Sequence, residues 1–202
     1  MSEVTSNGIP SGKPDVEQTV KYWQWILSIP KDKNPLNTGN INNDEFICLP
    51  CTGGGEDCSR KLDLSEQDAK KDILVPVFAS EYCTAEVLNG TDEELLETAR
   101  GMATPIHMEV SIDENPLVPY YVETEPFEVT VPISHVLDNV YAPPGTYRAI
   151  SAGFWHRLKP LSTGKHIIRF GGTGTNGFYT KVVYEVNVPR TEKEVFLNVR
   201  IL

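Results

Sequence analysis

Three consecutive segments between Tyr147 and Val188, in which apolar and polar residues alternate, constrain the fold of this chain more than any other feature. The segments are residues 153–159, 165–170 and 178–188, and short glycine-containing turns separate them. Successive side chains of a β-strand point to opposite faces, so each segment predicts a strand with one apolar face. The chain is therefore expected to build a β-sheet whose apolar side packs on a second layer.

The first two segments are predicted to pair as a hairpin. A three-residue loop at 162–164 sets Leu158 opposite Ile168 and matches the two apolar faces, whereas a two-residue turn mismatches them. The same register places Arg157 opposite Arg169, which is a mildly unfavourable pair of like charges. The predicted hairpin therefore contains one electrostatic conflict.

Further strands are predicted on both sides of these segments. Alternation recurs at 106–112, 127–131 and 195–201, while residues 73–79 are continuously apolar, as expected of a central strand. Pro76 lies inside that apolar run and cannot donate a hydrogen bond to a neighbouring strand. It therefore favours an edge position or a bulge for this strand.

Two helices are predicted as well. Residues 16–27 carry apolar side chains at helical spacing, with Asp15 as the expected N-cap and Pro30 after the end. Residues 91–94 have the form of a capping box and begin a short helix that ends at Gly101. The expected fold is mainly β: a two-layer antiparallel β-sandwich, jelly-roll or immunoglobulin-like, with an N-terminal amphipathic helix and one short internal helix.

The domain boundaries follow from composition. Residues 1–15 are polar and rich in Ser, Gly and Pro, so they are predicted to be a disordered tail, and residues 16–202 a single β-sandwich domain. The chain shows no signal-peptide pattern and no apolar run near the ~20 residues of a membrane span, which leaves its compartment open. A net charge of −10 and a pI near 4.9 predict a soluble acidic protein that does not bind nucleic acid.

Four cysteines, all in the first half of the chain, are the first candidate site: Cys48, Cys51, Cys58 and Cys83. Cys48 and Cys51 have the spacing of a zinc knuckle or of a redox dithiol, and Cys58 follows a glycine-rich turn. A structural zinc site made of all four sulfurs is one interpretation. Disulfides and ordinary free thiols are the others, and no further cofactor is indicated.

A second set of candidates consists of carboxylates and one histidine. Glu81 and Glu86 follow the predicted central strand, where they could bind a hard cation or act as acid and base. His107 and Glu109 share the outward face of a predicted strand, at a spacing that metal sites on strands also use. These four residues are the predicted ligand-binding group, and solvated surface positions are the alternative for each pair.

Three stretches taken together resemble an uncharacterised family of bacterial and archaeal proteins. They are a Trp-rich opening helix with the pattern WxWxxSIP at 23–30, a Pro-containing strand followed by an acidic segment at 73–86, and the pattern PLxxGxHxIxFG at 160–171. The resemblance implies the N-terminal helix and a long C-terminal hairpin, and it implies no activity. Residues 46–51 depart from the family pattern, so the cysteines there are expected to be particular to this protein.

The leading functional hypothesis is a non-catalytic binding or assembly domain, because no nucleophile–base constellation or cofactor fingerprint is legible and β-sandwiches often serve recognition. A protein partner or a homo-oligomer would then be expected. The alternative is a metal-dependent enzyme that uses the cysteine-rich region or the group of Glu81, Glu86 and His107.

Overall fold

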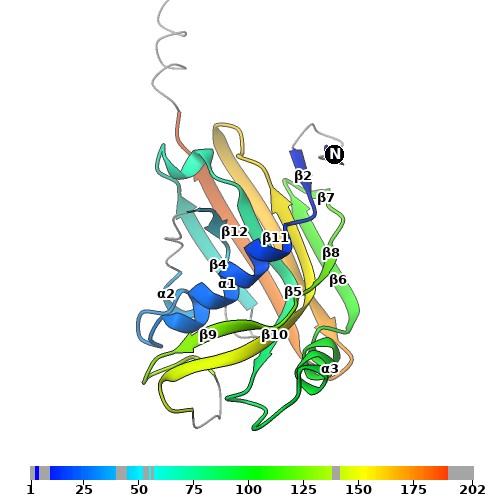
Figure 1. Cartoon of the computed structure of the whole chain (residues 1–202). Helices are drawn as coiled ribbons and strands as arrows, with labels where there is room; N and C mark the ends of the chain where they lie inside the picture. The colour runs from blue at the N-terminus through cyan, green and yellow to red at the C-terminus, as the bar shows by residue number, and fades with distance from the viewer. Residues whose placement is uncertain are drawn as a thin grey trace, which may run out of the picture.

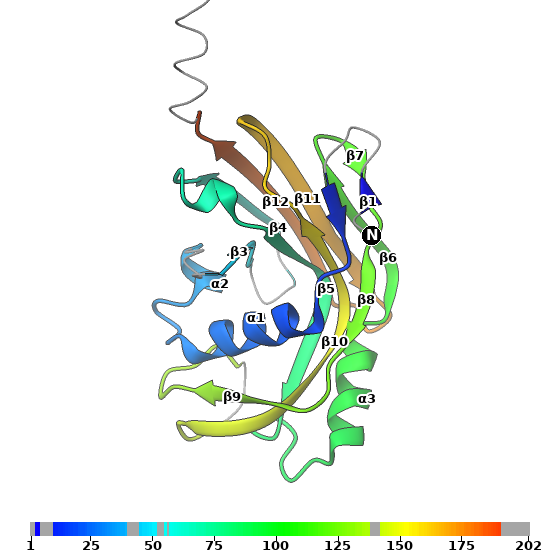
Figure 2. The same cartoon turned by 45° about the horizontal axis from the view of Figure 1, so that its top comes forward.

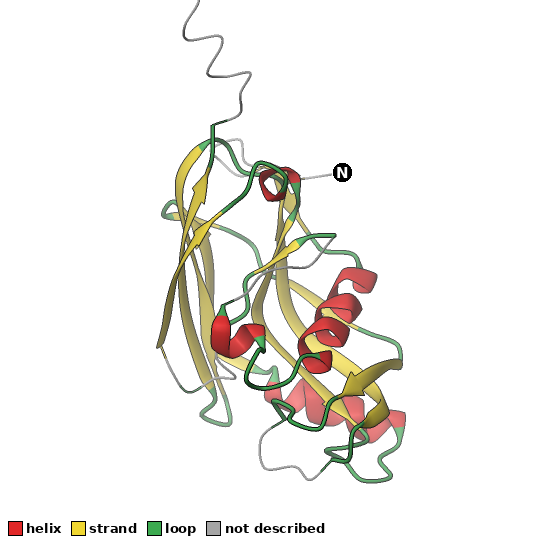
Figure 3. Cartoon of the chain, turned by 90° about the vertical axis from the view of Figure 1, so that its left-hand side faces the viewer, coloured by secondary structure: helices red, strands yellow, loops and turns green. Residues whose placement is uncertain are grey.

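The structure is a computed structural model in which two β-sheets pack face to face, with helices on the outer side of one sheet (Figure 3). It describes residues 3–4, 10–39, 45–51, 55, 57–137 and 142–190. The predicted two-layer, mainly β sandwich is confirmed. The expected strand at 195–201 lies outside the described residues. None of the described helices has the length and apolar character needed to cross a membrane.

The larger sheet has seven strands and is organised around β10, its longest strand (Figure 1). On one side β10 pairs with β5, and on the other side it pairs in turn with β9, β8 and β2. The strands of this sheet are β1 (Glu3–Val4), β2 (Pro10–Gly12), β3 (Ile47–Cys48), β5 (Ile73–Cys83), β8 (Tyr120–Glu123), β9 (Phe127–Val131) and β10 (Gly145–Leu158).

The smaller sheet has the strand order β4-β12-β11-β6-β7. Its strands are β4 (Asp57–Asp63), β6 (Pro105–Ile112), β7 (Asn115–Pro116), β11 (Gly164–Gly174) and β12 (Tyr179–Val188). Most pairs in both sheets are antiparallel, but β4 pairs with β12 and β3 with β5 in parallel.

Both predicted helices are present with the expected N-caps, and the second ends at Met102 rather than at the predicted Gly101. Helix α1 (Val16–Ser28) begins at Asp15, which forms a capping box with Gln18. Helix α3 (Asp92–Met102) begins at Thr91, whose main-chain N–H donates to the Glu94 carboxylate over 2.8 Å. The remaining helical elements are short: α2 (Pro35–Thr38) and the 3₁₀ turn η1 (Asp68–Lys70).

Two apolar cores stabilise this arrangement, one on each face of the larger sheet. The inter-sheet core lies between the two sheets and includes Ile73, Phe170 and Tyr184. The helix-side core lies between α1 and the outer face of the larger sheet, where Ile26 packs with Trp155, which is fully buried. Figure 2 shows the start of β10 curving with β9 beneath α1, so the larger sheet wraps around the helix.

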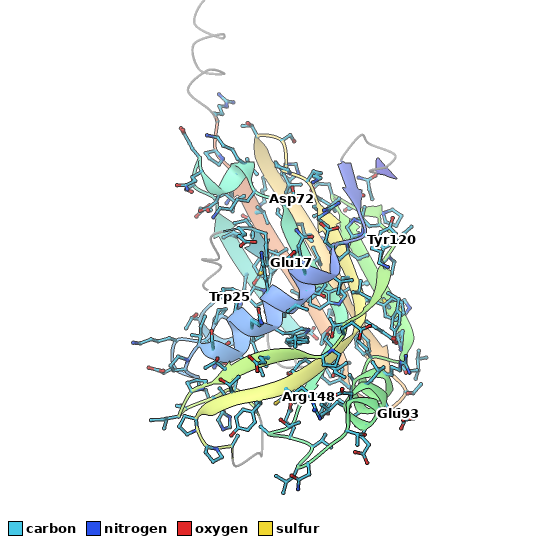
Figure 4. All side chains as sticks on the ribbon, viewed as in Figure 1. Glu17, Trp25, Asp72, Glu93, Tyr120 and Arg148 are labelled. Atoms are coloured by element: carbon cyan, nitrogen blue, oxygen red, sulfur yellow. A yellow bond between two sulfur atoms is a disulfide. The ribbon has the colours of Figure 1, made fainter. Side chains whose placement is uncertain are left out.

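Ion pairs fasten α3 to this sheet. Arg148 of β10, labelled in Figure 4, donates to the Asp92 carboxylate at 2.7 Å and to the Gly90 carbonyl at 2.9 Å. Arg100 of α3 makes a two-pronged contact with Glu123 of β8, with N–O distances of 2.6 and 2.7 Å. Helix α3 is thereby held against β8 and β10.

The predicted pairing of the first two C-terminal segments is wrong. β10 belongs to the larger sheet, while β11 lies in the smaller sheet between β6 and β12. Leu158 and Ile168 do face the same inter-sheet core, but from opposite layers. Alternation determines which face a side chain occupies and not which strand lies beside it.

The predicted disordered tail also differs from the structure. Residues 10–12 form β2, which pairs with Arg157 and Leu158 of β10, and Glu3–Val4 form β1, which pairs with β2. Such pairing uses main-chain hydrogen bonds and needs no apolar side chain, so a polar composition does not reveal it.

Candidate functional site

The site begins with an unpaired edge of β5. Its first two residues pair with β3, but from Val75 to Cys83 no described strand lies on that side. The main-chain N–H of Thr84 donates to Arg148 of β10. Main-chain groups of alternate residues point to opposite edges of a strand, so those of Ala79 and Glu81 point to the unpaired edge.

Pro76 lies where the pairing between β5 and β10 is irregular. Phe154 pairs with Phe78 and Trp155 with Pro76, so Val77 is an extra residue on β5. The predicted effect of Pro76, an edge or a bulge, is confirmed in both respects. A proline that cannot donate is tolerated here because no described strand needs its hydrogen bond.

A cavity of about 400 Å³ is lined by residues 76–82 of β5 and by side chains from both sides of the larger sheet. One wall comes from the helix side and is lined by Tyr22, Trp23, Ile26, Leu27, Leu36, Val136 and Leu137. The other wall comes mainly from the smaller sheet and is lined by Phe170, Phe178, Thr180 and Val182.

Close contacts fix both walls. The indole N–H of Trp23 donates to the Ser151 hydroxyl at 2.7 Å, and that hydroxyl donates to the Ser80 carbonyl at 2.9 Å. On the opposite side Phe78 packs against Phe178, with ring centroids 5.5 Å apart. A Cβ at Gly172 would meet the Phe78 ring at 3.2 Å, so this glycine leaves room for the ring.

The ionisable groups of the cavity gather where β5 ends. Glu81 and Cys83 are two residues apart on one strand, so their side chains share a face. The chain then turns, with the N–H groups of Glu86 and Val87 donating to the Cys83 carbonyl at 2.9 and 3.0 Å. This turn returns Glu86 to the strand, and one ligand atom from each of Glu81, Cys83 and Glu86 lies within 4.8 Å of the others.

The hydrogen bonds in this cluster are unequally shared. The Glu86 carboxylate accepts from the Cys83 main-chain N–H at 3.1 Å and from the Cys83 thiol at 3.4 Å. In contrast, Oε1 of Glu81 is buried and has no hydrogen-bond partner, and the residue is only 7% exposed. Glu81 therefore brings an unsatisfied acceptor into the site.

Burial governs the electrostatics of the cluster. It raises the pKa of Glu81 well above the ordinary value, and the charge of Glu86 raises that pKa further. Burial also raises the pKa of Glu86, while hydrogen bonds from Cys83 and the charge of His135 act in the opposite direction. The Cys83 pKa is raised by burial and by both carboxylates. Within the described residues no lysine or arginine forms an ion pair with Glu81 or Glu86.

His135, from a distant part of the chain, acts on this cluster through its charge. It follows β9, is half-buried, and its Nδ1 atom is buried without a hydrogen-bond partner. No sequence signal identified this residue, because a lone histidine about 50 positions from Glu86 forms no recognisable motif.

The four cysteines do not form the predicted zinc site. Cys51 and Cys58 are joined in a disulfide, which was one of the alternatives. Cys48 and Cys83 are free and buried in the helix-side core. Burial raises the Cys48 pKa well above its ordinary value, so its thiol stays protonated. Disulfide sulfurs supply no thiolate to a metal, so of the four only Cys83 stands beside other potential ligands.

The predicted ligand-binding group is split between two places. Glu81 and Glu86 line the cavity, whereas His107 and Glu109 are exposed on β6 of the other sheet. His107 and Glu109 pair in register with Thr173 and Gly171 of β11. His107 and Glu109 are therefore surface positions, whereas a role for Glu81 and Glu86 in ligand binding stays a prediction.

Comparisons with known proteins add little to this geometry. No family model and no curated protein matches the chain. One solved structure, described as "Structure of PbICP-C in complex with falcipain-2", is 12% identical, and the match covers 74% of this chain and 95% of that one with a TM-score of 0.25. At that TM-score the likeness carries no argument. The resemblance to the uncharacterised bacterial and archaeal family stays a prediction.

Proposed function

We propose that the protein is a non-catalytic binding domain that takes an extended peptide segment along the unpaired edge of β5. The observation that carries this proposal is the position of the cavity, which is lined by Pro76 to Tyr82 of β5, where that strand has an unpaired edge. Addition of a strand to such an edge is a recurrent mode of peptide recognition.

Main-chain chemistry favours a peptide over a purely apolar small molecule. The N–H and C=O groups of Ala79 and Glu81 face the edge at which no described strand pairs with β5, so they need hydrogen-bond partners from elsewhere. An apolar ligand would cover these groups without bonding to them, at a cost of about 1–3 kcal/mol for each group left unsatisfied. An extended peptide offers matching donors and acceptors at the spacing of a strand.

The two walls also suit a peptide. Alternate side chains of an added strand point to opposite faces, and both faces of β5 are lined by apolar groups. One side chain would lie against Trp23 and Ile26, and the next against Phe170 and Phe178. A segment with apolar residues at successive positions is therefore the expected ligand, and residue size would set its specificity.

The alternative hypothesis, a metal-dependent enzyme, keeps only part of its residue set. The disulfide removes Cys51 and Cys58, and His107 lies on the other sheet. Glu81 and Glu86 remain, and they line the cavity at one end. The Cys83 thiol beside them is buried and its pKa is raised, so it is a poor nucleophile. A bound peptide would contact the apolar walls along the whole cavity, whereas a metal-dependent reaction would use only the end beside Glu81 and Glu86.

A test selects random linear peptides displayed on phage against the full chain and counter-selects against Thr180→Trp, in which an indole fills the cavity from the β12 side. Thr146→Trp is the matched control, since Thr146 is an exposed strand threonine on β10 away from the cavity. Selected peptides are expected to bind wild type and Thr146→Trp equally and to lose at least about tenfold in affinity for Thr180→Trp, a change of ~1.4 kcal/mol.

Nuclear magnetic resonance then locates the peptide, because the amides of Ala79 and Glu81 should become protected from exchange when a strand is added. A concentration-dependent dimer that Thr180→Trp abolishes would identify a second copy as the source of the segment. Peptides that bind Thr180→Trp as tightly as wild type, or that protect amides elsewhere, would contradict the proposal.

A further inference from the structure

The ionisable end of the cavity contains more ligand atoms than the chain itself satisfies. Oε1 of Glu81 and Nδ1 of His135 are both buried without hydrogen-bond partners. Two carboxylates of an ordinary surface cluster would be solvated, but Glu81 is 7% exposed and cannot be. Burial of an unpaired carboxylate is costly, so it marks a place where a further group is expected.

The geometry points to a divalent zinc site whose ligands are Glu81, Cys83 and Glu86, with His135 as the fourth. The first three already bring ligand atoms within 4.8 Å of one another, which allows one ion to contact all three after small side-chain rotations. His135 is not part of that group of atoms, although its charge acts on Glu86, so its side chain would have to turn toward the ion. Its free Nδ1 is the type of atom that completes a four-coordinate site.

The donor set selects among metals. Calcium and magnesium take oxygen ligands, so a sulfur donor disfavours both. Two carboxylates, one thiolate and one imidazole match the tetrahedral preferences of zinc, and cobalt(II) would occupy the same geometry. The expected ion is therefore zinc rather than a hard cation.

The backbone holds the ligands before any ion is present. Glu81 and Cys83 are fixed by the pairing of β5 with β10, in register with Ser151 and Ala149. Glu86 is fixed by the turn that closes on the Cys83 carbonyl. On binding, the Cys83 thiol gives up its proton to solvent and its hydrogen bond to Glu86, and a sulfur–metal bond replaces them.

The zinc site uses the side chains of Glu81, Cys83 and Glu86, whereas peptide binding uses main-chain groups of β5 and the apolar walls of the cavity. Titration with zinc alone, in the absence of peptide, therefore tests one proposal without the other. Failure to bind zinc would not count against peptide binding at the edge of β5. Failure to bind peptides would not count against zinc binding by the ligand cluster.

The experiment titrates zinc chloride into the full chain, purified without a histidine tag and freed of metal with a chelator, and follows binding by calorimetry. Cobalt(II) is titrated in parallel, because a cobalt–thiolate bond adds a charge-transfer absorption in the near ultraviolet. One zinc ion per chain and a thiolate absorption with cobalt are the expected results for wild type.

Three variants locate the ion. Glu81→Gln keeps the shape of the side chain and should lower zinc affinity at least about tenfold. Removal of a residue that only hydrogen-bonds to a metal ligand already costs about that much, so loss of a direct ligand should cost no less. Cys83→Ser should abolish the cobalt–thiolate absorption. His135→Gln should weaken zinc binding while that absorption persists.

Matched controls separate this site from other ligands. Cys48→Ser changes the other free buried thiol, and Glu109→Gln changes an exposed strand carboxylate next to His107, so neither should alter zinc affinity or the cobalt spectrum. Absence of stoichiometric zinc, or a cobalt spectrum of wild type without the thiolate absorption, would overturn the proposal without reference to any variant. Zinc binding that survives Glu81→Gln unchanged but is lost in Glu109→Gln would assign the ion to β6 instead.

Discussion

Two glutamates on opposite sides of β10 have opposite surroundings. Glu123 of β8 pairs in register with Ala152, and Glu81 of β5 pairs with the preceding residue, Ser151. Arg100 contacts both oxygens of Glu123, and these bonds lower the Glu123 pKa to about 2. Glu81 has no ion pair among the described residues, and burial raises its pKa.

The difference distinguishes a carboxylate that stabilises the fold from a carboxylate that we propose binds a ligand. The carboxylate of Glu123 is satisfied within the chain, by Arg100 of α3 and by the hydroxyl of Tyr121, and it holds that helix to the sheet. Oε1 of Glu81 has no hydrogen-bond partner, although the fold places Glu81 beside Cys83 and Glu86 at one end of the cavity. A buried acid without a partner reduces stability, which is why we propose an external ligand for Glu81.

The largest expected effect is stabilisation by zinc. Free zinc at a thousand times its dissociation constant should raise the free energy of unfolding of wild type by about 4 kcal/mol, because an ion that binds only the folded state shifts the equilibrium by mass action. Urea denaturation with and without zinc measures this difference. Glu123→Gln should keep the stabilisation, whereas a tenfold loss of zinc affinity in Glu81→Gln would reduce it by about 1.4 kcal/mol. Equal stabilisation of both variants would remove the distinction between the two glutamates.

Glu81→Gln should have the next largest effect when metal is absent. In chelator at pH 8 the variant should be more stable than wild type by roughly 1–3 kcal/mol, because a neutral amide of the same shape replaces a carboxylate that is buried without a partner. Chemical denaturation of both proteins in the same buffer gives the comparison. A variant less stable than wild type would show that an interaction within the chain already satisfies Glu81.

Glu123→Gln should have the smallest effect. The pair with Arg100 is partly exposed, and solvent screening limits its contribution to about 0.2–1 kcal/mol at pH 7. The folded-state pKa of Glu123 lies below its ordinary value of 4.5, so the contribution is present above that value and is lost as the pH falls toward about 2. Unfolding curves at pH 7 and pH 3 should therefore differ less for Glu123→Gln than for wild type.

The sequence predicted which faces of the strands are buried better than it predicted which strands pair with one another. Period-two alternation identified the inward faces of β10 and β11, and the caps at Asp15 and Thr91 located both helices. The incorrectly predicted hairpin contained an unfavourable feature, because it placed Arg157 opposite Arg169. The structure removes that conflict by placing β10 and β11 in different sheets. Pairing depends on contacts between distant segments, which local periodicity does not contain.

The candidate site could be predicted only in part. The sequence predicts Glu81 and Glu86 as a pair that follows a strand ending at Ala79. In the structure this strand continues to Cys83. That extension places Cys83 on the same face as Glu81, so Cys83 belongs with the carboxylates and not with Cys48. The two-residue spacing of positions 79, 81 and 83 is the sequence feature that indicates a strand continuing to Cys83. The approach of His135 depends on the tertiary fold and has no local signature.

The most direct test is anomalous diffraction at the zinc edge from crystals of the metal-loaded protein. A single peak should lie roughly 2.0–2.3 Å from the Cys83 sulfur and from one oxygen each of Glu81 and Glu86, the distances typical of zinc–sulfur and zinc–oxygen bonds. A peak beside His107 and Glu109, or no peak together with a hydrogen bond from the chain to Oε1 of Glu81, would contradict the assignment of this cluster as an incomplete site.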